Sequence, residues 1–274
     1  MSDGATFLAL HQGPEPLVLP NPWDVGSARL FESLGFRALA TTSGGFAATL
    51  GRLDGRVSRE EALAHAAAIV AATDLPVSAD LEDGFGDDPA AVWATVDGAR
   101  VAGLAGCSIE DYRGHPGGSG VATDHGIFDI GLAVERVAAA AESAHAGPAR
   151  LVLTARAENH LRGRLDLADT IARLQRYQEA GADVLYAPGI TEVADIRALV
   201  TSIDRPLNVL VRPGVPPVSV LAELGVRRIS IGGAFAYLAL GAAAEAAREL
   251  LEDGTYRWLE KAAGGAQVAR GAFS

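Results

Sequence analysis

Short runs of apolar and β-branched residues recur along the chain, and alanine-rich stretches with apolar positions at helical spacing follow them. Segments 59–72 and 166–180 show this helical spacing most clearly. Glycines stand where such helices should end before the next strand, as in Ala180-Gly-Ala-Asp183. The pattern predicts eight strands, at residues 17–21, 38–43, 76–82, 106–111, 150–159, 183–188, 207–211 and 228–232.

Eight strand–helix units predict one closed parallel (β/α)8 TIM barrel, and 274 residues match the length of about 250 that such a barrel needs. A doubly wound sheet is the rival arrangement, but no Gly-x-Gly-x-x-Gly follows the first predicted strand. We therefore expect a single α/β domain over residues 1–274. Segment 234–251 is apolar on more than one face and predicts an extra C-terminal helix that needs burial. Residues 264–274 are expected to form a flexible tail.

Composition narrows the function mainly by exclusion. With 49% hydrophobic and 21% charged residues the chain has a globular balance, and its net charge of −11 argues against nucleic acid or an anionic membrane as partner. The single cysteine, Cys107, rules out an internal disulfide and fits a reducing compartment. The start of the chain does not resemble a signal peptide and no apolar run is long enough to span a bilayer, so we expect a cytoplasmic protein.

Polar and apolar residues alternate at the ends of three consecutive predicted strands. Because residues two apart share a face and barrel enzymes carry their chemistry at the C-terminal strand ends, the polar sets should face the barrel mouth. Asp80, Glu110 and Arg156 should then converge, and three such residues together outweigh the alternative of ordinary rim ion pairs. Crowded carboxylates repel unless a cation lies among them, and oxygen ligands favour Mg²⁺, with Mn²⁺ as a further option. The polar sets are Ser78, Asp80 and Glu82; Ser108 and Glu110; and Thr154, Arg156 and Glu158.

Two glycine-containing segments follow predicted strands. The turn Ser43-Gly44-Gly45 could offer backbone N–H groups to a carboxylate or phosphoryl group, although most such turns only change the chain direction. Segment 112–129 contains five glycines and is predicted to be a lid that excludes water, with disorder as the alternative. Arg113 and His115 are candidate donors on this lid, or else simply solvated side chains.

Five stretches in their order and spacing resemble the isocitrate lyase/phosphoenolpyruvate mutase superfamily, in particular the 2-methylisocitrate lyases. The resemblance runs from about Leu17 to Leu251. Any one of the stretches is a weak signal, whereas all five in this order are specific. They are Asn21-Pro-Trp-Asp24, Thr42–Gly51 with Asp54 just beyond, Ser78–Gly86, Ser108-Ile-Glu-Asp111 and Ala155-Arg-Ala-Glu158.

The resemblance implies a carbon–carbon lyase that cleaves a bond next to a 2-oxo acid, through an enolate stabilised by Mg²⁺ and an arginine. It also implies exchange of a C-terminal helix between subunits, and hence a homodimer or homotetramer, with packing of that helix on its own barrel as the simpler alternative. By the same resemblance, the catalytic residues are Arg156, Asp54 and Glu110; the substrate-binding residues are Ser43, Gly44, Gly45, Arg156 and Trp23; and the metal-binding residues are Asp80, Glu110 and Asp54.

Two departures from the superfamily pattern affect the metal and the proton donor. Ser78 stands where the family's metal strand usually begins with Asp, so Asp80 becomes the main direct ligand, with Glu82 or Asp83 compensating. The cysteine-containing loop of the lyases is replaced by Asp111-Tyr-Arg-Gly-His-Pro-Gly-Gly118. Cys107 cannot substitute, because it precedes Glu110 on the strand and alternates away from the mouth.

Three other side chains each have two interpretations. Tyr112 and Tyr186 are candidates for a proton relay or for packing, and Arg212 is either a second anion anchor or a partner in a salt bridge that fixes its loop. The leading hypothesis is an Mg²⁺-dependent lyase for a small 2-oxo or 2-hydroxy di- or tricarboxylate, such as oxaloacetate, isocitrate or an alkylmalate. The alternatives are a P–C bond enzyme (phosphonomutase or phosphonopyruvate hydrolase) and a barrel that binds a 2-oxo acid without catalysis.

Overall fold

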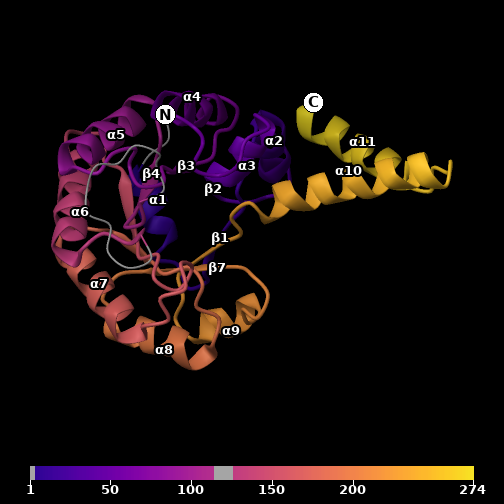
Figure 1. Ribbon diagram of the computed structural model, residues 1–274. Coiled ribbons are helices and arrows are strands. Elements are labelled where there is room, and N and C mark those ends of the chain that lie inside the picture. The colour runs from indigo at the N-terminus through magenta and orange to yellow at the C-terminus, as the bar shows by residue number, and fades with distance from the viewer. Residues whose placement is uncertain (1–3, 114–125) are drawn as a thin grey trace.

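The computed structural model describes residues 4–113 and 126–274 and shows parallel strands enclosed by helices (Figure 1). Hydrogen-bonded neighbours follow the order β1-β8-β7-β6-β5-β4-β3-β2 in an eight-stranded sheet. Between the two end strands, Ala40 N donates to Pro20 O at 3.1 Å, so the ring is nearly closed and the predicted TIM barrel is confirmed. The strands are β1 (Leu17–Leu19), β2 (Leu39–Ala40), β3 (Val77–Asp80), β4 (Gly106–Glu110), β5 (Val152–Arg156), β6 (Val184–Tyr186), β7 (Leu207–Leu210) and β8 (Arg228–Ser230).

Helix starts follow the capping residues in the sequence. The Ser58 side chain accepts from Glu61 N, while the Glu61 side chain accepts from Ser58 N at 2.9 Å, which is a capping box. Asp88 caps the next helix, in which Pro89 takes the first position, where a missing N–H costs nothing. The helices are α1 (Gly4–Leu10), α2 (Val25–Ser33), α3 (Ser43–Thr49), α4 (Arg59–Val70), α5 (Pro89–Val101), α6 (Ile130–Ala144), α7 (Leu167–Glu179), α8 (Val193–Ser202), α9 (Val218–Glu223), α10 (Ala234–Glu252) and α11 (Leu259–Phe273).

The barrel interior is apolar at one end and polar at the other. A large outer core lies between strands and helices, and a smaller inner cluster joins Phe7 of α1 to Leu17, Val152 and Val184. A side chain at Gly106 would place its Cβ 2.9 Å from the Phe7 ring and 2.7 Å from Val152 O, so this closely packed end requires glycine there. Because this inner apolar cluster fills one end of the barrel, polar chemistry is expected at the other end, where the strands have their C-termini.

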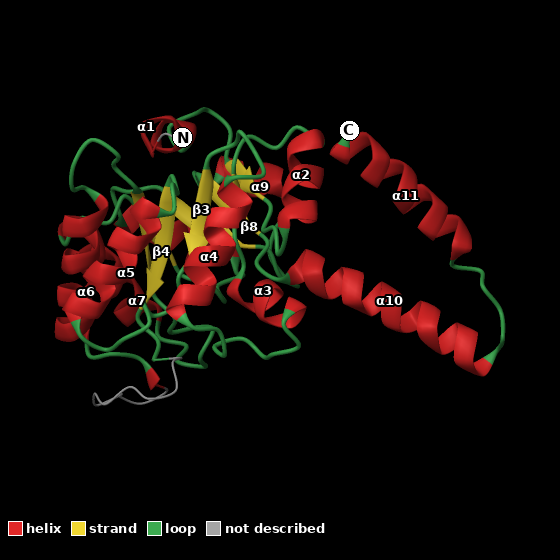
Figure 2. Cartoon of the chain, turned by 90° about the horizontal axis from the view of Figure 1, so that it is seen from above, coloured by secondary structure: helices red, strands yellow, loops and turns green. Residues whose placement is uncertain are grey.

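Helices α10 and α11 form an arm that leaves the barrel and folds back toward α2 (Figure 2). Residues 264–273 therefore belong to a helix, rather than to the flexible tail expected from the sequence. The physical reason is a contact that the local composition does not reveal, because the Phe273 ring lies 3.6 Å from the position a Cβ of Gly26 would take. Of the helices in the described ranges, none has both the length and the apolar character needed to cross a bilayer.

Candidate active site

Arg156 ends β5 and occupies the centre of a charged cluster at the barrel mouth. It stands in register with Glu110 of β4 and Tyr186 of β6. Its Nη1 lies 3.2 Å from Glu110 Oε2 and 3.9 Å from Asp80 Oδ1, and its Nε donates to Glu158. The guanidinium also lies 5.1 Å from the centre of the Tyr186 ring. The structure thus brings Asp80, Glu110 and Arg156 together, as the strand alternation predicts.

A second arginine, Arg162, was missed by the sequence analysis. Its Nε donates to Glu158 Oε2 at 2.9 Å, its Nη2 lies 3.8 Å from Glu110 Oε1, and its guanidinium lies 3.4 Å from the centre of the Tyr112 ring. Glu158 is fully buried and so accepts from two guanidinium groups at once. The four-residue spacing of Glu158 and Arg162 was the available signal, but Arg162 lies in a turn beyond the predicted strand.

Asp111 fixes the end of β4 to the surrounding helices. Its Oδ1 accepts from Glu158 N at 2.8 Å, and its Oδ2 accepts from Tyr177 Oη at 2.5 Å and from Arg173 Nη1 at 3.1 Å. Burial raises the pKa of Asp111, and the Arg173 charge opposes that shift. Asp111 is therefore a buried support for the Glu110 and Glu158 positions rather than a group facing the mouth.

The segment after β2 is helix α3, not the loop that the sequence predicts. Thr42 caps this helix by accepting from Gly45 N at 3.2 Å, and this tertiary setting outweighs the low helix propensity of two glycines. Ser43 donates to Asp80 Oδ2 from its hydroxyl at 2.8 Å and from its N–H at 3.3 Å. The donors that Ser43 and Gly45 were expected to offer to a substrate thus already have internal partners, and Ser43 positions Asp80.

Gly44 allows two other groups to approach the site closely. A Cβ at this position would lie 2.7 Å from the Tyr237 hydroxyl and 3.3 Å from Asp54 Cγ. Asp54 stands at the rim with its outer edge exposed; loss of solvation in the cleft and the charge of Asp80 raise its pKa. Tyr237 comes from α10, so the arm reaches the site, a contact the sequence analysis missed because α10 follows the last strand.

These side chains surround an upper cavity with room of about 160 Å³ for water-sized groups. Burial, together with the charge of Asp80, raises the pKa of Glu82 to about 8, and burial also raises the pKa of Glu110. Strand β3 ends at Asp80, two residues before the predicted end, because Glu82 adopts a left-handed backbone with φ 49°. Glu82 still faces the cavity. The residues that line the upper cavity are Ser43, Asp54, Gly55, Glu82, Glu110, Tyr112, Arg156 and Arg162.

The donor set fits a hydrated Mg²⁺ better than a closed metal cage. Within residues 4–113 and 126–274, no group of three His, Cys, Asp or Glu side chains is close enough to enclose an ion. Mg²⁺ commonly keeps several waters and takes only one or two carboxylates, and the crowded carboxyl groups here gain from a nearby cation. Asp80, with Asp54 and Glu110 acting through water, can supply such a site. Ser78 is buried in the barrel below Asp80.

Several residues singled out from the sequence lie elsewhere. Trp23 lines a separate apolar pocket of about 200 Å³ between α3 and α10. Arg113 turns to Asp87, with Nη2 and Oδ2 2.8 Å apart, and Arg212 is exposed beyond β7. His115 and most of the predicted lid lie outside the described residues, whereas Tyr112 lines the upper cavity. Cys107 packs in the outer core, as its strand position predicts, and burial raises its pKa to about 12.

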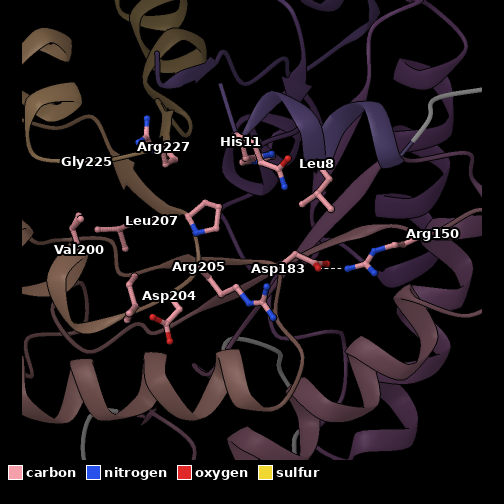
Figure 3. Close-up of a pocket in the computed structure, with 13 residues that line it drawn as sticks. Leu8, His11, Arg150, Asp183, Val200, Asp204, Arg205, Leu207, Gly225 and Arg227 are labelled. Carbon is pink, nitrogen blue, oxygen red and sulfur yellow. Dashed lines mark hydrogen bonds and ion pairs between the residues drawn. The ribbon is translucent and has the colours of Figure 1, made fainter. Parts of the chain in front are cut away.

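A larger pocket of about 450 Å³ lies at the opposite end of the barrel, between α1 and the beginnings of the later strands (Figure 3). Figure 3 shows Arg150 facing Asp183, whose Oδ2 is also 2.9 Å from His145 Nε2. Barrel enzymes place their chemistry at the C-terminal strand ends, so the size of this pocket does not make it the active site. Its ion pairs join the residues just before β5 and β6 to the residue that follows α6, and so support the fold.

The family model for phosphoenolpyruvate phosphomutase matches residues 7–251 of the chain. The chain belongs to this family. The match covers the barrel and α10, and with it the resemblance to the isocitrate lyase/phosphoenolpyruvate mutase superfamily is confirmed.

Relatives of this family member include proteins with several activities. A solved Burkholderia cenocepacia J2315 protein, provisionally described as a lyase/mutase, is 48% identical over 97% of this chain and 95% of its own, with a TM-score of 0.91. Solved 2,3-dimethylmalate lyase is 30% identical over 94% of this chain and 90% of its own, with a TM-score of 0.81. Oxaloacetate decarboxylase of Chromohalobacter salexigens is 30% identical over 89% of this chain and 83% of its own. The chain is thus an enzyme of a lyase and mutase superfamily.

Proposed function

We propose that the protein is an Mg²⁺-dependent lyase that cleaves a C–C bond in a small 2-oxo or 2-hydroxy dicarboxylate, of the oxaloacetate or alkylmalate kind. The observation that carries this proposal is Arg156, held by Glu110 and Glu158 at the mouth of a cavity rich in carboxylates. The cavity has room for about a dozen water-sized groups, a size that favours a four- to six-carbon substrate over a larger one. Two relatives are named for 2,3-dimethylmalate and oxaloacetate, which are such compounds.

In a 2-hydroxy substrate of this kind, loss of the hydroxyl proton lets the C2–C3 bond break. C2 becomes the carbonyl carbon of a 2-oxo acid, and the bonding electron pair moves onto the carboxylate of the departing fragment, whose enediolate then takes a proton. Arg156 lies where it can hold that developing negative charge, since its guanidinium is fixed on two sides by carboxylates and covered by Tyr186. Ser43 keeps Asp80 oriented toward the same space.

Bound Mg²⁺ supplies a positive charge that offsets Asp80, Asp54 and Glu110 and polarises a substrate oxygen. That charge matters in a chain of net charge −11, because an anionic substrate otherwise meets a repulsive field. Tyr112 and Arg162, stacked on each other at the cavity wall, then limit access of bulk water to the reacting carbon.

The test is an assay of purified protein with and without Mg²⁺ against oxaloacetate, 2,3-dimethylmalate, 2-methylisocitrate and phosphonopyruvate. We expect pyruvate release from at least one of the carbon substrates, and a loss of about 100- to 1,000-fold in kcat/KM in Arg156→Gln and Asp80→Asn. Arg176→Gln, on the exposed face of α7, is the matched control and should keep full activity. Turnover of phosphonopyruvate alone would replace this proposal with P–C chemistry, and 2-oxo acid binding without turnover would replace it with a binding barrel.

We also propose that the protein is a homo-oligomer in which the arm packs against a second subunit. In α10 only Ala236 is buried, and in α11 no residue is. Helices that display this much apolar surface are stable in water when another surface covers them.

A further inference from the structure

Arg228 at the beginning of β8 is an arginine buried inside the barrel without an acidic partner. Its side chain is 4% exposed, and its Nη1 donates to Thr154 Oγ1 at 2.8 Å. Its Nε has no hydrogen-bond partner, and across the described part of the chain no carboxylate lies within ion-pair distance of it. Burial lowers the pKa of Arg228 to about 10, so the guanidinium keeps its charge at neutral pH.

This guanidinium faces the active-site side of the barrel. It lines a lower cavity together with Ser108, Asp80, Arg156, Tyr186 and Ser230, which lie on the inner faces of neighbouring strands. It does not line the pocket at the opposite end, where the neighbouring Arg227 is found instead (Figure 3). Arg156 lines both the lower and the upper cavity, so the two cavities adjoin at this residue.

The size and chemistry of the lower cavity fit a carboxylate group. It has room of about 40 Å³ for water-sized groups, which is about three such groups and matches the three heavy atoms of a carboxylate. An unpaired buried cation is costly, and the planar guanidinium of an arginine binds carboxylate oxygens through strong charge-assisted hydrogen bonds. Asp80 also lines the cavity, but its oxygens already accept from Ser43 at 2.8 Å and from Glu82 N at 3.4 Å.

We propose that the lower cavity is a carboxylate subsite, in which Arg228 binds the second carboxylate of a dicarboxylate substrate whose reacting end lies in the upper cavity. The sequence analysis named Arg212 as a candidate second anion anchor, but Arg212 is exposed, and we assign this role to Arg228 instead. The inference rests on the proposed function only in taking the substrate to be a dicarboxylate. It explains why the barrel retains a charge that apolar packing would replace at lower cost.

The test is calorimetric binding of malate and lactate in the presence of Mg²⁺, because these two hydroxy acids differ by one carboxylate and binding needs no turnover. The wild type should bind malate at least tenfold more tightly than lactate. Arg228→Met should weaken malate binding 10- to 100-fold and change lactate binding less than threefold. Arg227→Met, at the other end of the barrel, is the matched control and should alter neither affinity.

Thermal melting separates a ligand role from a structural one. Removal of an unpaired buried charge should leave the Tm of the ligand-free Arg228→Met protein unchanged or higher, and malate should raise the Tm of the wild type and of Arg227→Met more than that of Arg228→Met. If Arg228→Met fails to fold, Arg228→Lys takes its place, because it keeps the charge and loses the planar fork, and it should still weaken malate binding selectively. Equal loss of malate and lactate binding, no loss in the variants, or no malate binding by the wild type would overturn the subsite. Arg228-dependent malate binding without any substrate turnover would leave the subsite standing and reject the lyase.

Discussion

At the scale of single residues, Glu158 determines how Arg156 and Arg162 are held. It is fully buried and is the acceptor shared by their two Nε groups. In Glu158→Gln the charge is removed while the shape is kept, so two buried guanidinium groups lose their common counter-charge. We expect a loss of about 3 kcal/mol in the free energy of unfolding and a roughly 10- to 100-fold lower kcat, since Arg156 is no longer fixed.

Urea unfolding and steady-state kinetics measure both effects. The control is Glu179→Gln, which breaks an exposed pair with Arg176 at 3.6 Å and should cost about 0–1 kcal/mol. Equal unfolding midpoints for the two variants would show that Glu158 does not hold the cluster.

The residues of the site differ in how far the sequence could reveal them. Asp80, Glu110 and Arg156 were predictable, because strand alternation determines which side chains face the mouth and because barrels keep chemistry at that end. Arg228 was not, since an arginine at the start of a strand is usually at the surface and only barrel closure buries this one. Tyr237 was hidden for a similar reason, because its place beside Gly44 depends on the path of the whole chain.

At the scale of elements, α1 closes the bottom of the barrel and carries a pH-dependent residue just beyond its end. His11 is buried; its Nδ1 lies 2.8 Å from Phe7 O, a carbonyl that can only accept, while Nε2 has no partner. Burial, with the charge of Arg228, lowers the pKa of His11 to about 4. The folded protein thus resists taking up a proton that the unfolded chain accepts near pH 6.5.

Stability that depends on neutral His11 is therefore fully present above pH 6.5 and is lost as the pH falls toward about 4. Between pH 7.5 and 4.5 we expect the wild type to lose about 2–3 kcal/mol more than His11→Leu, which cannot titrate at this position. Urea unfolding of the two proteins at both pH values gives this difference directly, and the comparison cancels the titration of groups they share. A difference near zero would mean that the interior under α1 admits a charged imidazole.

At the same scale, some helices and strands could be predicted from the local sequence and others could not. The strands were found because their apolar runs are repeated and regularly spaced, although each is shorter than predicted. Helix α3 was mistaken for a loop, because Ser43-Gly44-Gly45 favours a turn locally, whereas the Thr42 cap and tertiary contacts such as the packing of Gly45 against Trp23 stabilise a helix there. Helix α11 was mistaken for a tail because its partner α2 lies at the other end of the sequence.

At the scale of the whole molecule, the arm carries both a contact with the candidate active site and a large exposed apolar surface. Helix α10 presents Tyr237 to Gly44 and Asp54 on one side and exposes Leu238, at 68% of its surface, on another. Leu251, at the far end of the same helix, is 84% exposed. Because apolar surface of this extent is rare on a monomer, we expect a second copy to cover it.

We predict that light scattering at about 10 μM finds the wild type as a dimer or tetramer. The double variant Leu238→Asp with Leu251→Asp should be shifted toward monomer, because each introduced charge would have to be buried in the interface. The matched control is Leu165→Asp, which places the same charge at an isolated leucine that is 78% exposed on the barrel. Since the arm also supplies Tyr237, the monomeric variant should lose activity in parallel with assembly, whereas the control keeps both. A wild type that is monomeric at this concentration would contradict the assembly. An active monomeric variant would show that catalysis does not depend on assembly. The contact of Tyr237 with the site would then be made within each subunit alone.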